Sequence, residues 1–195
     1  FENTPQLPDE DCEREMYALT GEFLAKFGYY RYEISNYALP GYECRHNIGY
    51  WRRENYLGLG AGAASLIENV RFRNLRDTGG YEQMQELPSE SGQGKVLPER
   101  DGMFHEERQV LSKAEQMEEF MFLGLRMTKG VSREEFSEAF GTAMDEVYPG
   151  IVENFCKKGL LRERKDDKTG RTWISLTDYG MDISNYVMAD FLLTV

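Results

Sequence analysis

A histidine close to flat aromatic side chains is the first feature of the sequence that could carry chemistry. His46, one of two histidines, is followed by Asn47, Tyr50 and Trp51. If this stretch is helical, Tyr50 lies on the face of His46, four residues further on, and the other two residues form the adjacent pair. The imidazole could then ligate heme iron while the rings pack on the macrocycle and Asn47 orients a polar edge. Spacing alone favours the alternative, a hydrogen-bonded structural histidine with Trp51 as a core anchor.

A glycine-rich segment is the second candidate. Gly58, Gly60 and Gly62 precede Ala64, and the segment formally satisfies the G-x-G-x-x-A form of a dinucleotide fingerprint. That fingerprint needs a buried strand before it and a helix after it, whereas a charged stretch precedes this segment and a strand-like run follows. Small residues at this density permit close approach of another backbone or of a flat ligand. Tight packing and proximity to a cofactor both remain open.

No other catalytic constellation stands out. Cys-x-x-Cys, Gly-Lys-Ser/Thr and His-Glu-x-x-His are absent, and Cys12, Cys44 and Cys156 are far apart. We therefore expect reduced thiols, without a disulfide framework or paired metal ligands. Cys44-Arg45-His46 lacks the second cysteine of a c-type heme attachment site, and His105 is expected to be a solvated residue near a linker.

Periodicity places the elements that must position these residues. The first half is expected to contain a helix over 9–27, a strand over 30–35, a short helix over 42–51, a strand-like run over 59–74 with a turn at Glu68-Asn69, and a short helix over 81–87. The second half is expected to contain a helix over 107–128, a helix opened by a capping box at Ser132 and Glu135, a helix over 144–158 ended by Gly159, a hairpin of 160–165 and 172–176, and a helix over 177–193.

Composition places a domain boundary between the halves. From Pro88 to Gly102 the chain is rich in Pro, Ser, Gly, Gln and charge, with almost no apolar periodicity, which is typical of a linker. We divide the chain into a first part over 1–87, a linker over 88–104 and a C-terminal domain over 105–195. The second part has the element order of a winged-helix-like domain, so the predicted fold class is α+β.

Charge narrows the range of partners. The formal net charge is −11, from 34 acidic and 23 basic residues, and such a field repels phosphate backbones and anionic lipids. Residues 131–195 carry 8 Lys and Arg against 12 Asp and Glu, a net of −4, which disfavours DNA binding by a winged helix. No window approaches the ~20 apolar residues that span a bilayer. We expect a cytoplasmic protein without an integral membrane segment, and, because Phe1 is not Met, a chain cut from something longer.

The order and spacing of several motifs resemble a known family. They are Tyr32-Glu33-Ile34-Ser35-Asn36-Tyr37-Ala38, Pro40-Gly41, Arg45-His46-Asn47-x-x-Tyr50-Trp51, Tyr56-Leu57-Gly58-Leu59-Gly60-Ala61-Gly62-Ala63 and Arg71-x-Arg73-Asn74. This pattern resembles the oxygen-independent coproporphyrinogen III oxidase-like radical SAM proteins. The His-Asn-x-x-Tyr-Trp run resembles their heme-chaperone, HemW-type branch, and the second half resembles the family's C-terminal domain.

The resemblance implies an α/β parent protein in which a partial TIM-like barrel holds a [4Fe–4S] cluster and S-adenosylmethionine, followed by a helical, winged-helix-like domain. This chain would supply the end of the barrel and that domain, with the N-terminal barrel of the same chain as its missing partner. By the same resemblance, His46 would ligate or contact heme iron, with Asn47, Tyr50 and Trp51 completing the motif. Main chain at Gly60, Gly62 and Ala64 would lie near S-adenosylmethionine.

The resemblance departs from the family at one place, because the Cys-x-x-x-Cys-x-x-Cys cluster motif is absent from this sequence. Without three closely spaced thiolates, this fragment would not cleave S-adenosylmethionine by itself. Three functions therefore stand as expectations. The first is a parent that binds heme or porphyrin and delivers heme to acceptor proteins. The alternatives are part of an oxygen-independent coproporphyrinogen III oxidase of heme biosynthesis, and a winged-helix protein-interaction module.

Overall fold

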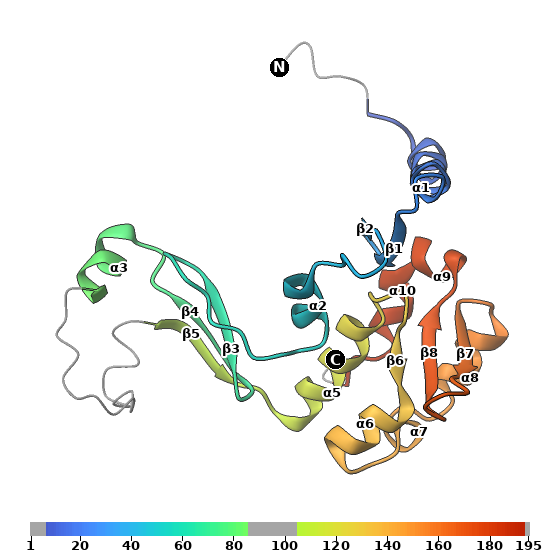
Figure 1. Ribbon diagram of the computed structural model, residues 1–195. Helices are drawn as coiled ribbons and strands as arrows, with labels where there is room; N and C mark the ends of the chain where they lie inside the picture. The colour runs from blue at the N-terminus through green and yellow to red at the C-terminus, as the bar shows by residue number, and fades with distance from the viewer. Residues whose placement is uncertain (1–6, 86–104, 194–195) are drawn as a thin grey trace.

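The computed structural model describes residues 7–85 and 105–193, so the expected linker lies outside the described residues. Figure 1 shows a body of helices and strands, and an arm of three strands and a short helix that extends away from the body. The sheets described in these ranges have the strand orders β1-β2, β3-β4-β5 and β6-β8-β7, and their paired strands run antiparallel. The fold is thus a mixture of helices and separate antiparallel sheets, in line with the predicted α+β class.

The elements before the gap follow local sequence signals. They are α1 (Glu10–Ala25), β1 (Tyr30–Glu33), β2 (Asn36–Ala38), α2 (Arg45–Trp51), β3 (Ala64–Ile67), β4 (Val70–Asn74) and α3 (Thr78–Gln85). The helices over 9–27 and 42–51 are confirmed, and the Asp9 side chain caps α1 by accepting a hydrogen bond from Cys12 N at 2.9 Å. Glu68 and Asn69 have φ of 48° and 63°, so the predicted hairpin turn between β3 and β4 is also confirmed.

The strand predicted over 30–35 is confirmed over Tyr30–Glu33 but ends two residues early, because the chain turns back after Glu33. The Glu33 carboxylate accepts hydrogen bonds from Ser35 N at 2.9 Å and from Asn36 Nδ2 at 2.5 Å. These bonds stabilise the turn that joins β1 to β2. The buried carboxylate thus closes a two-stranded hairpin.

After the gap the chain begins with a strand. The elements here are β5 (His105–Val110), α5 (Lys113–Gly124), β6 (Val131–Ser132), α6 (Arg133–Phe140), α7 (Met144–Val147), α8 (Ile151–Lys157), β7 (Leu161–Lys165), β8 (Thr172–Leu176), α9 (Asp178–Asp182) and α10 (Ser184–Ala189). The predicted β7–β8 hairpin is confirmed. Ser132 caps α6 as predicted: its hydroxyl accepts a hydrogen bond from Glu135 N at 3.3 Å and donates one to Glu134, while the reciprocal bond of a full capping box, from Ser132 N to the Glu135 carboxylate, is not formed.

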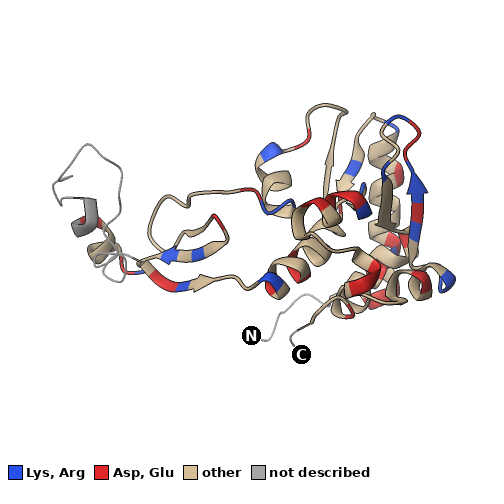
Figure 2. Cartoon of the chain, turned by 90° about the horizontal axis from the view of Figure 1, so that it is seen from below, with Lys and Arg blue, Asp and Glu red and all other residues tan. Residues whose placement is uncertain are grey.

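The helix predicted over 107–128 is wrong at its start. Residues 105–110 pair with β4, and opposite charges meet along this part of the arm (Figure 2): Arg73 and Arg76 form ion pairs with Glu107. The expectation of a solvated His105 near a linker is therefore wrong as well, since His105 pairs with Asn74 in the sheet and its ring lies 4.4 Å from that of Phe72. The helix starts at a capping box formed by Ser112 and Glu115.

Two helices predicted to be continuous are broken. The segment 144–158 divides into α7 and α8 at Pro149-Gly150, where proline removes a backbone donor and Gly150 has a φ of 73°. The segment 177–193 divides at Ile183, which has a φ of −117° and a ψ of 34°. These breaks let short helices turn around the core.

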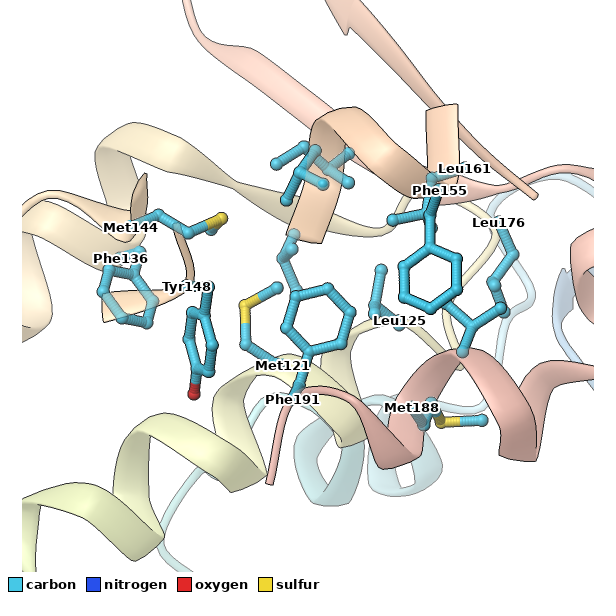
Figure 3. Close-up of a cluster of buried hydrophobic side chains, with 14 of the residues drawn as sticks. Met121, Leu125, Phe136, Met144, Tyr148, Phe155, Leu161, Leu176, Met188 and Phe191 are labelled. Carbon is cyan, nitrogen blue, oxygen red and sulfur yellow. The ribbon is translucent and has the colours of Figure 1, made fainter. Parts of the chain in front are cut away.

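The core lies within the body and is built from apolar side chains of residues 117–191. Figure 3 shows the rings of Tyr148, Phe191 and Phe155 one after another, and neighbouring ring centroids are 5.2 and 6.4 Å apart. Phe136 extends this cluster toward α6, with its ring 6.0 Å from Tyr148. Among the described residues before Leu111, Ile34 is the apolar residue that packs against it. The arm therefore contributes little to the core.

Replacing Gly130 by alanine should destabilise the body by about 3 kcal/mol, measured by urea unfolding. Its φ is +77°, and a Cβ would collide with the Ile174 carbonyl. Gly170 is the matched control, because its φ of +71° carries the same strain but nothing lies within 4 Å of the added Cβ. Alanine there should cost only about 1 kcal/mol. Equal losses at the two positions would contradict the close approach between Gly130 and β8.

Candidate functional site around helix α2

Helix α2 places His46 and Tyr50 side by side, as their spacing predicts. The two ring centroids lie 4.6 Å apart, and Tyr50 meets Tyr56 edge-on at 4.5 Å. His46 is exposed, whereas both tyrosines are half-buried. The imidazole therefore stands at the open end of a short row of aromatic rings.

The hollow beside His46 is small. Its volume is about 100 Å³, and its lining includes His46, Tyr50, Glu54 and Tyr56. Pockets that enclose a drug-sized ligand measure about 300–1,000 Å³. A flat macrocycle at His46 would therefore lie across an open surface.

Trp51 lies apart from this hollow. The Arg126 guanidinium carbon is 4.4 Å from the Trp51 ring centroid, and Arg126 Nη2 is 3.5 Å from the buried Glu33 carboxylate. Trp51 lines two other cavities, neither of which is lined by His46. Asn47 is half-buried on α2. The structure thus brings together two of the four predicted heme-motif residues, His46 and Tyr50, and directs Trp51 toward α5.

A buried glutamate, Glu119, holds the end of α2 in place. The sequence motifs gave it no role. Glu119 of α5, only 6% exposed, accepts from Arg53 Nε at 2.9 Å and pairs with Arg71 Nη2 at 2.8 Å. Arg53 Nη2 also donates to Asn69 Oδ1 at 3.1 Å, within the turn between β3 and β4. This network joins α2, the arm and α5. Glu119 could have been singled out from the sequence, because it is an acid within an apolar helical run. A buried acid of this kind needs a cationic partner.

The glycine-rich segment is held by hydrogen bonds within the chain. Asn74 Nδ2 donates to the carbonyls of Gly58 and Gly60 at 3.0 and 2.9 Å, and Gly60 N donates to the Tyr81 hydroxyl at 2.9 Å. Gly62 N donates to the Leu75 carbonyl at 2.8 Å, and Ala64 pairs with Arg73 in the sheet. A Cβ on Gly58 would collide with the Ala64 carbonyl. Close backbone packing accounts for Gly58, whereas Gly60 and Gly62 have φ of +105° and +70°, a conformation that favours glycine.

The cysteines are separate free thiols. Cys12 and Cys44 are exposed, whereas partial burial raises the pKa of the Cys156 thiol above its ordinary value. Across the two described ranges, His, Cys, Asp and Glu side chains form no group of three that could hold a metal ion. In those ranges no helix has both the length and the apolar character needed to cross a bilayer.

Comparison with known proteins places this geometry in a family. Residues 111–167 match the HemN C-terminal domain. The heme chaperone HemW of Lactococcus lactis is 37% identical over 96% of this chain, and that of Bacillus subtilis is 36% identical over 95%. The chain belongs to the HemN/HemW family. It spans about 44% of the length of these HemW relatives.

A solved structure shows a HemN-like fold. Coproporphyrinogen III oxidase (HemN) from Escherichia coli, described as a radical SAM enzyme, matches 99% of this chain and 44% of its own with a TM-score of 0.65. Because the two chains are only 16% identical, this match bears on the fold. The family resemblance drawn from the sequence motifs is thus confirmed, and its HemW-type branch agrees with the curated relatives.

Proposed function

We propose that this chain is part of a heme chaperone, and that it binds heme through His46 for delivery to acceptor proteins. The observation that carries the proposal is the exposed imidazole of His46 beside the Tyr50 ring, in a chain whose curated relatives are named heme chaperones. A neutral imidazole is a common axial ligand of heme iron. The half-buried rings of Tyr50 and Tyr56 offer a surface on which the macrocycle can pack.

The open surface beside His46 suits the transfer of heme to another protein better than its permanent retention. A macrocycle held at a hollow of about 100 Å³ leaves most of its surface accessible, so an acceptor protein can approach it before release. Asn47 is positioned on the same helix, where it can meet a polar edge. Trp51 acts from the other side by fixing α2 against α5 through Arg126.

We further propose the domain organisation of the parent. Residues 1–87 would complete a partial TIM-like radical SAM barrel, and a linker over 88–104 would precede a winged-helix-like domain. That domain would run over 105–195, and the HemN C-terminal match over residues 111–167 lies within it. The order of α6, α7, α8 and the β7–β8 hairpin supports this assignment.

The family also implies a [4Fe–4S] cluster and S-adenosylmethionine in the parent. The described residues do not fit the cluster, because Cys12 and Cys44 lie on different elements and Cys156 is partly buried in the body. Gly60 N, Gly60 O and Gly62 N form hydrogen bonds within the chain, so contact with S-adenosylmethionine would fall to the remaining main chain of this segment, up to Ala64. The three free thiols suit a reducing compartment, so we place the parent in the cytoplasm.

The second candidate is part of an oxygen-independent coproporphyrinogen III oxidase, favoured by the fold match to HemN. Such an enzyme converts propionates of coproporphyrinogen III to vinyl groups. Conversion of this substrate by the reconstituted parent protein would favour the oxidase over the chaperone.

Adding hemin to the chain should shift the Soret band, and His46→Gln should abolish the shift, because the substitution removes the proposed iron ligand. His105→Gln is the matched control, since it removes the other histidine, which lies on the arm. Circular dichroism checks that both variants fold. An unchanged Soret shift in His46→Gln would exclude this residue as the ligand.

A further inference from the structure

A tight turn follows α2 and folds the chain back over the helix. Arg53 N donates to the Tyr50 carbonyl at 3.1 Å, and Glu54 N donates to the Gly49 carbonyl at 2.9 Å. This pair of bonds is that of a Schellman motif, in which the first residue beyond the helix cap has a left-handed backbone. Arg53 occupies that position with a φ of 56°, which is uncommon for residues other than glycine. The turn therefore returns Glu54 to the last turn of α2.

Contacts outside the helix hold Arg53 in this conformation. Its guanidinium pairs with the buried Glu119 of α5 and donates to Asn69 Oδ1 in the arm. An uncommon backbone conformation persists where the surrounding structure fixes it, and such residues cluster at functional sites. The fixed turn thus determines where the next residue, Glu54, lies.

The Glu54 side chain lies over Gly49. A Cβ added to Gly49 would be 3.2 Å from Glu54 Oε2, so the missing side chain leaves the room that the carboxylate occupies. Gly49 follows His46 by three residues, and residues at this spacing share one face of a helix. The turn therefore brings the carboxylate to the face of α2 that carries the imidazole.

Glu54 and His46 both line the small hollow of about 100 Å³. Side chains on the walls of so small a hollow are close neighbours. Arg45 and Asn55 line it as well. Asn55 Oδ1 accepts a hydrogen bond from Glu68 N at 3.0 Å, and Arg45 forms no ion pair with Glu54 in the part of the chain that the structure describes. Glu54 is the carboxylate in this lining.

The imidazole and the carboxylate are both available to pair. Among the described residues, neither the His46 ring nitrogens nor the Glu54 carboxylate oxygens have a hydrogen-bond partner. Both side chains are exposed, so rotation about their own bonds can join them. A ring N–H donates a strong, charge-assisted hydrogen bond to a carboxylate. A macrocycle lying across the hollow would exclude water and strengthen that bond further.

We propose that Glu54 is a positioning residue for His46: its carboxylate accepts the imidazole Nδ1–H and thereby leaves Nε2 free to ligate heme iron. A histidine that binds a metal commonly donates its other ring N–H to a carboxylate, which fixes the ring and makes the ligating nitrogen more basic. Hydrogen bonding to the axial ligand also tunes the reduction potential of heme, and a more basic ligand favours the ferric state. The inference rests on the proposed heme function and adds the group that selects the tautomer of the ligand.

Long-range ¹⁵N–¹H spectra of the heme-free chain report the tautomer of His46, and His46→Gln assigns its signals. At a pH at which the imidazole is neutral, we expect mainly the Nδ1–H form, whereas free histidine prefers the Nε2–H form. Glu54→Met removes the acceptor and should move His46 toward the Nε2–H form. The same tautomer populations in the unmodified chain and in Glu54→Met would overturn the proposal.

Hemin binding tests the consequence for the ligand. Glu54→Met should weaken hemin affinity about tenfold, and Glu54→Gln, which keeps a neutral acceptor, should weaken it less. Glu54→Gln should also make the reduction potential of bound heme more positive, because the charge beside the imidazole is lost. Glu15→Gln on exposed helix α1 is the matched control, and it should change neither quantity. Losses of the same size in Glu15→Gln would show a general effect of charge and contradict the positioning role.

Both Glu54 variants should fold, because backbone hydrogen bonds and Arg53 hold the turn. Circular dichroism checks this. If His46→Gln binds hemin as tightly as the unmodified chain, the proposed heme function fails, and the heme-free spectra still decide whether Glu54 orients the imidazole. If hemin binding needs His46 but the tautomer does not respond to Glu54→Met, only the role of Glu54 fails.

Discussion

Replacing Phe155 by alanine should lower the free energy of unfolding by about 3–5 kcal/mol. The side chain has no exposed surface, and its ring packs 5.8 Å from Tyr186 and 6.4 Å from Phe191. Truncation removes these contacts and leaves a void, because α8 is held against strand β7 and cannot collapse inward. Urea unfolding followed by circular dichroism measures the loss.

Phe27→Ala is the control for this experiment. Phe27 follows α1 and is 63% exposed, so its truncation should change stability by less than about 0.5 kcal/mol. Similar losses for the two phenylalanines would mean that the aromatic row in the body does not form the core.

Replacing Glu119 by leucine should cost about 3–5 kcal/mol, because it leaves two guanidinium groups without their shared carboxylate. Arg53 has a side chain only 10% exposed, so water cannot fully replace the lost partner. The same substitution should loosen α2, since the arm and α5 meet at this residue. Urea unfolding measures the stability, and hemin affinity measures the effect on α2.

Glu153→Leu is the matched comparison, because Glu153 forms an ion pair with Lys157 in which both side chains are more than 70% exposed. Its loss should change stability by less than about 1 kcal/mol. A double variant, Glu119→Leu with Arg53→Met, should recover part of the lost stability, since the stranded charge is removed. No recovery would show that the carboxylate acts by something other than pairing with Arg53.

The elements that were predicted correctly are those specified by neighbouring residues. The acidic first turn predicts the start of helix α1. Glu68-Asn69 predicts the β3–β4 turn, because asparagine tolerates a left-handed backbone conformation. Strand β5 was missed because its sequence is charged, and its partner β4 is more than 30 residues earlier. The two strands pair through a backbone ladder, and Arg73 and Arg76 meet Glu107 across it, a long-range match that periodicity does not reveal.

The same distinction holds for the candidate site. Contact between His46 and Tyr50 follows from helical spacing, and the structure confirms it. The orientation of Trp51 could not be predicted, because it is set by Arg126 and Glu33, which are far from it in the sequence. The burial of Glu119 could not be predicted either, because its partners Arg53 and Arg71 are also far from it in the sequence.

The arm can open locally while the body stays folded. Its strands are hydrogen-bonded to one another, yet among the described residues ahead of Leu111 only Ile34 packs on the core. Amide protons of β3 and β4 can therefore exchange with solvent through local opening that leaves the body folded, whereas those of β8 exchange only when the body unfolds. Glu119 pairs with Arg71 of the arm and with Arg53 beside α2, so we expect its loss to make exchange in the arm still more independent of the body.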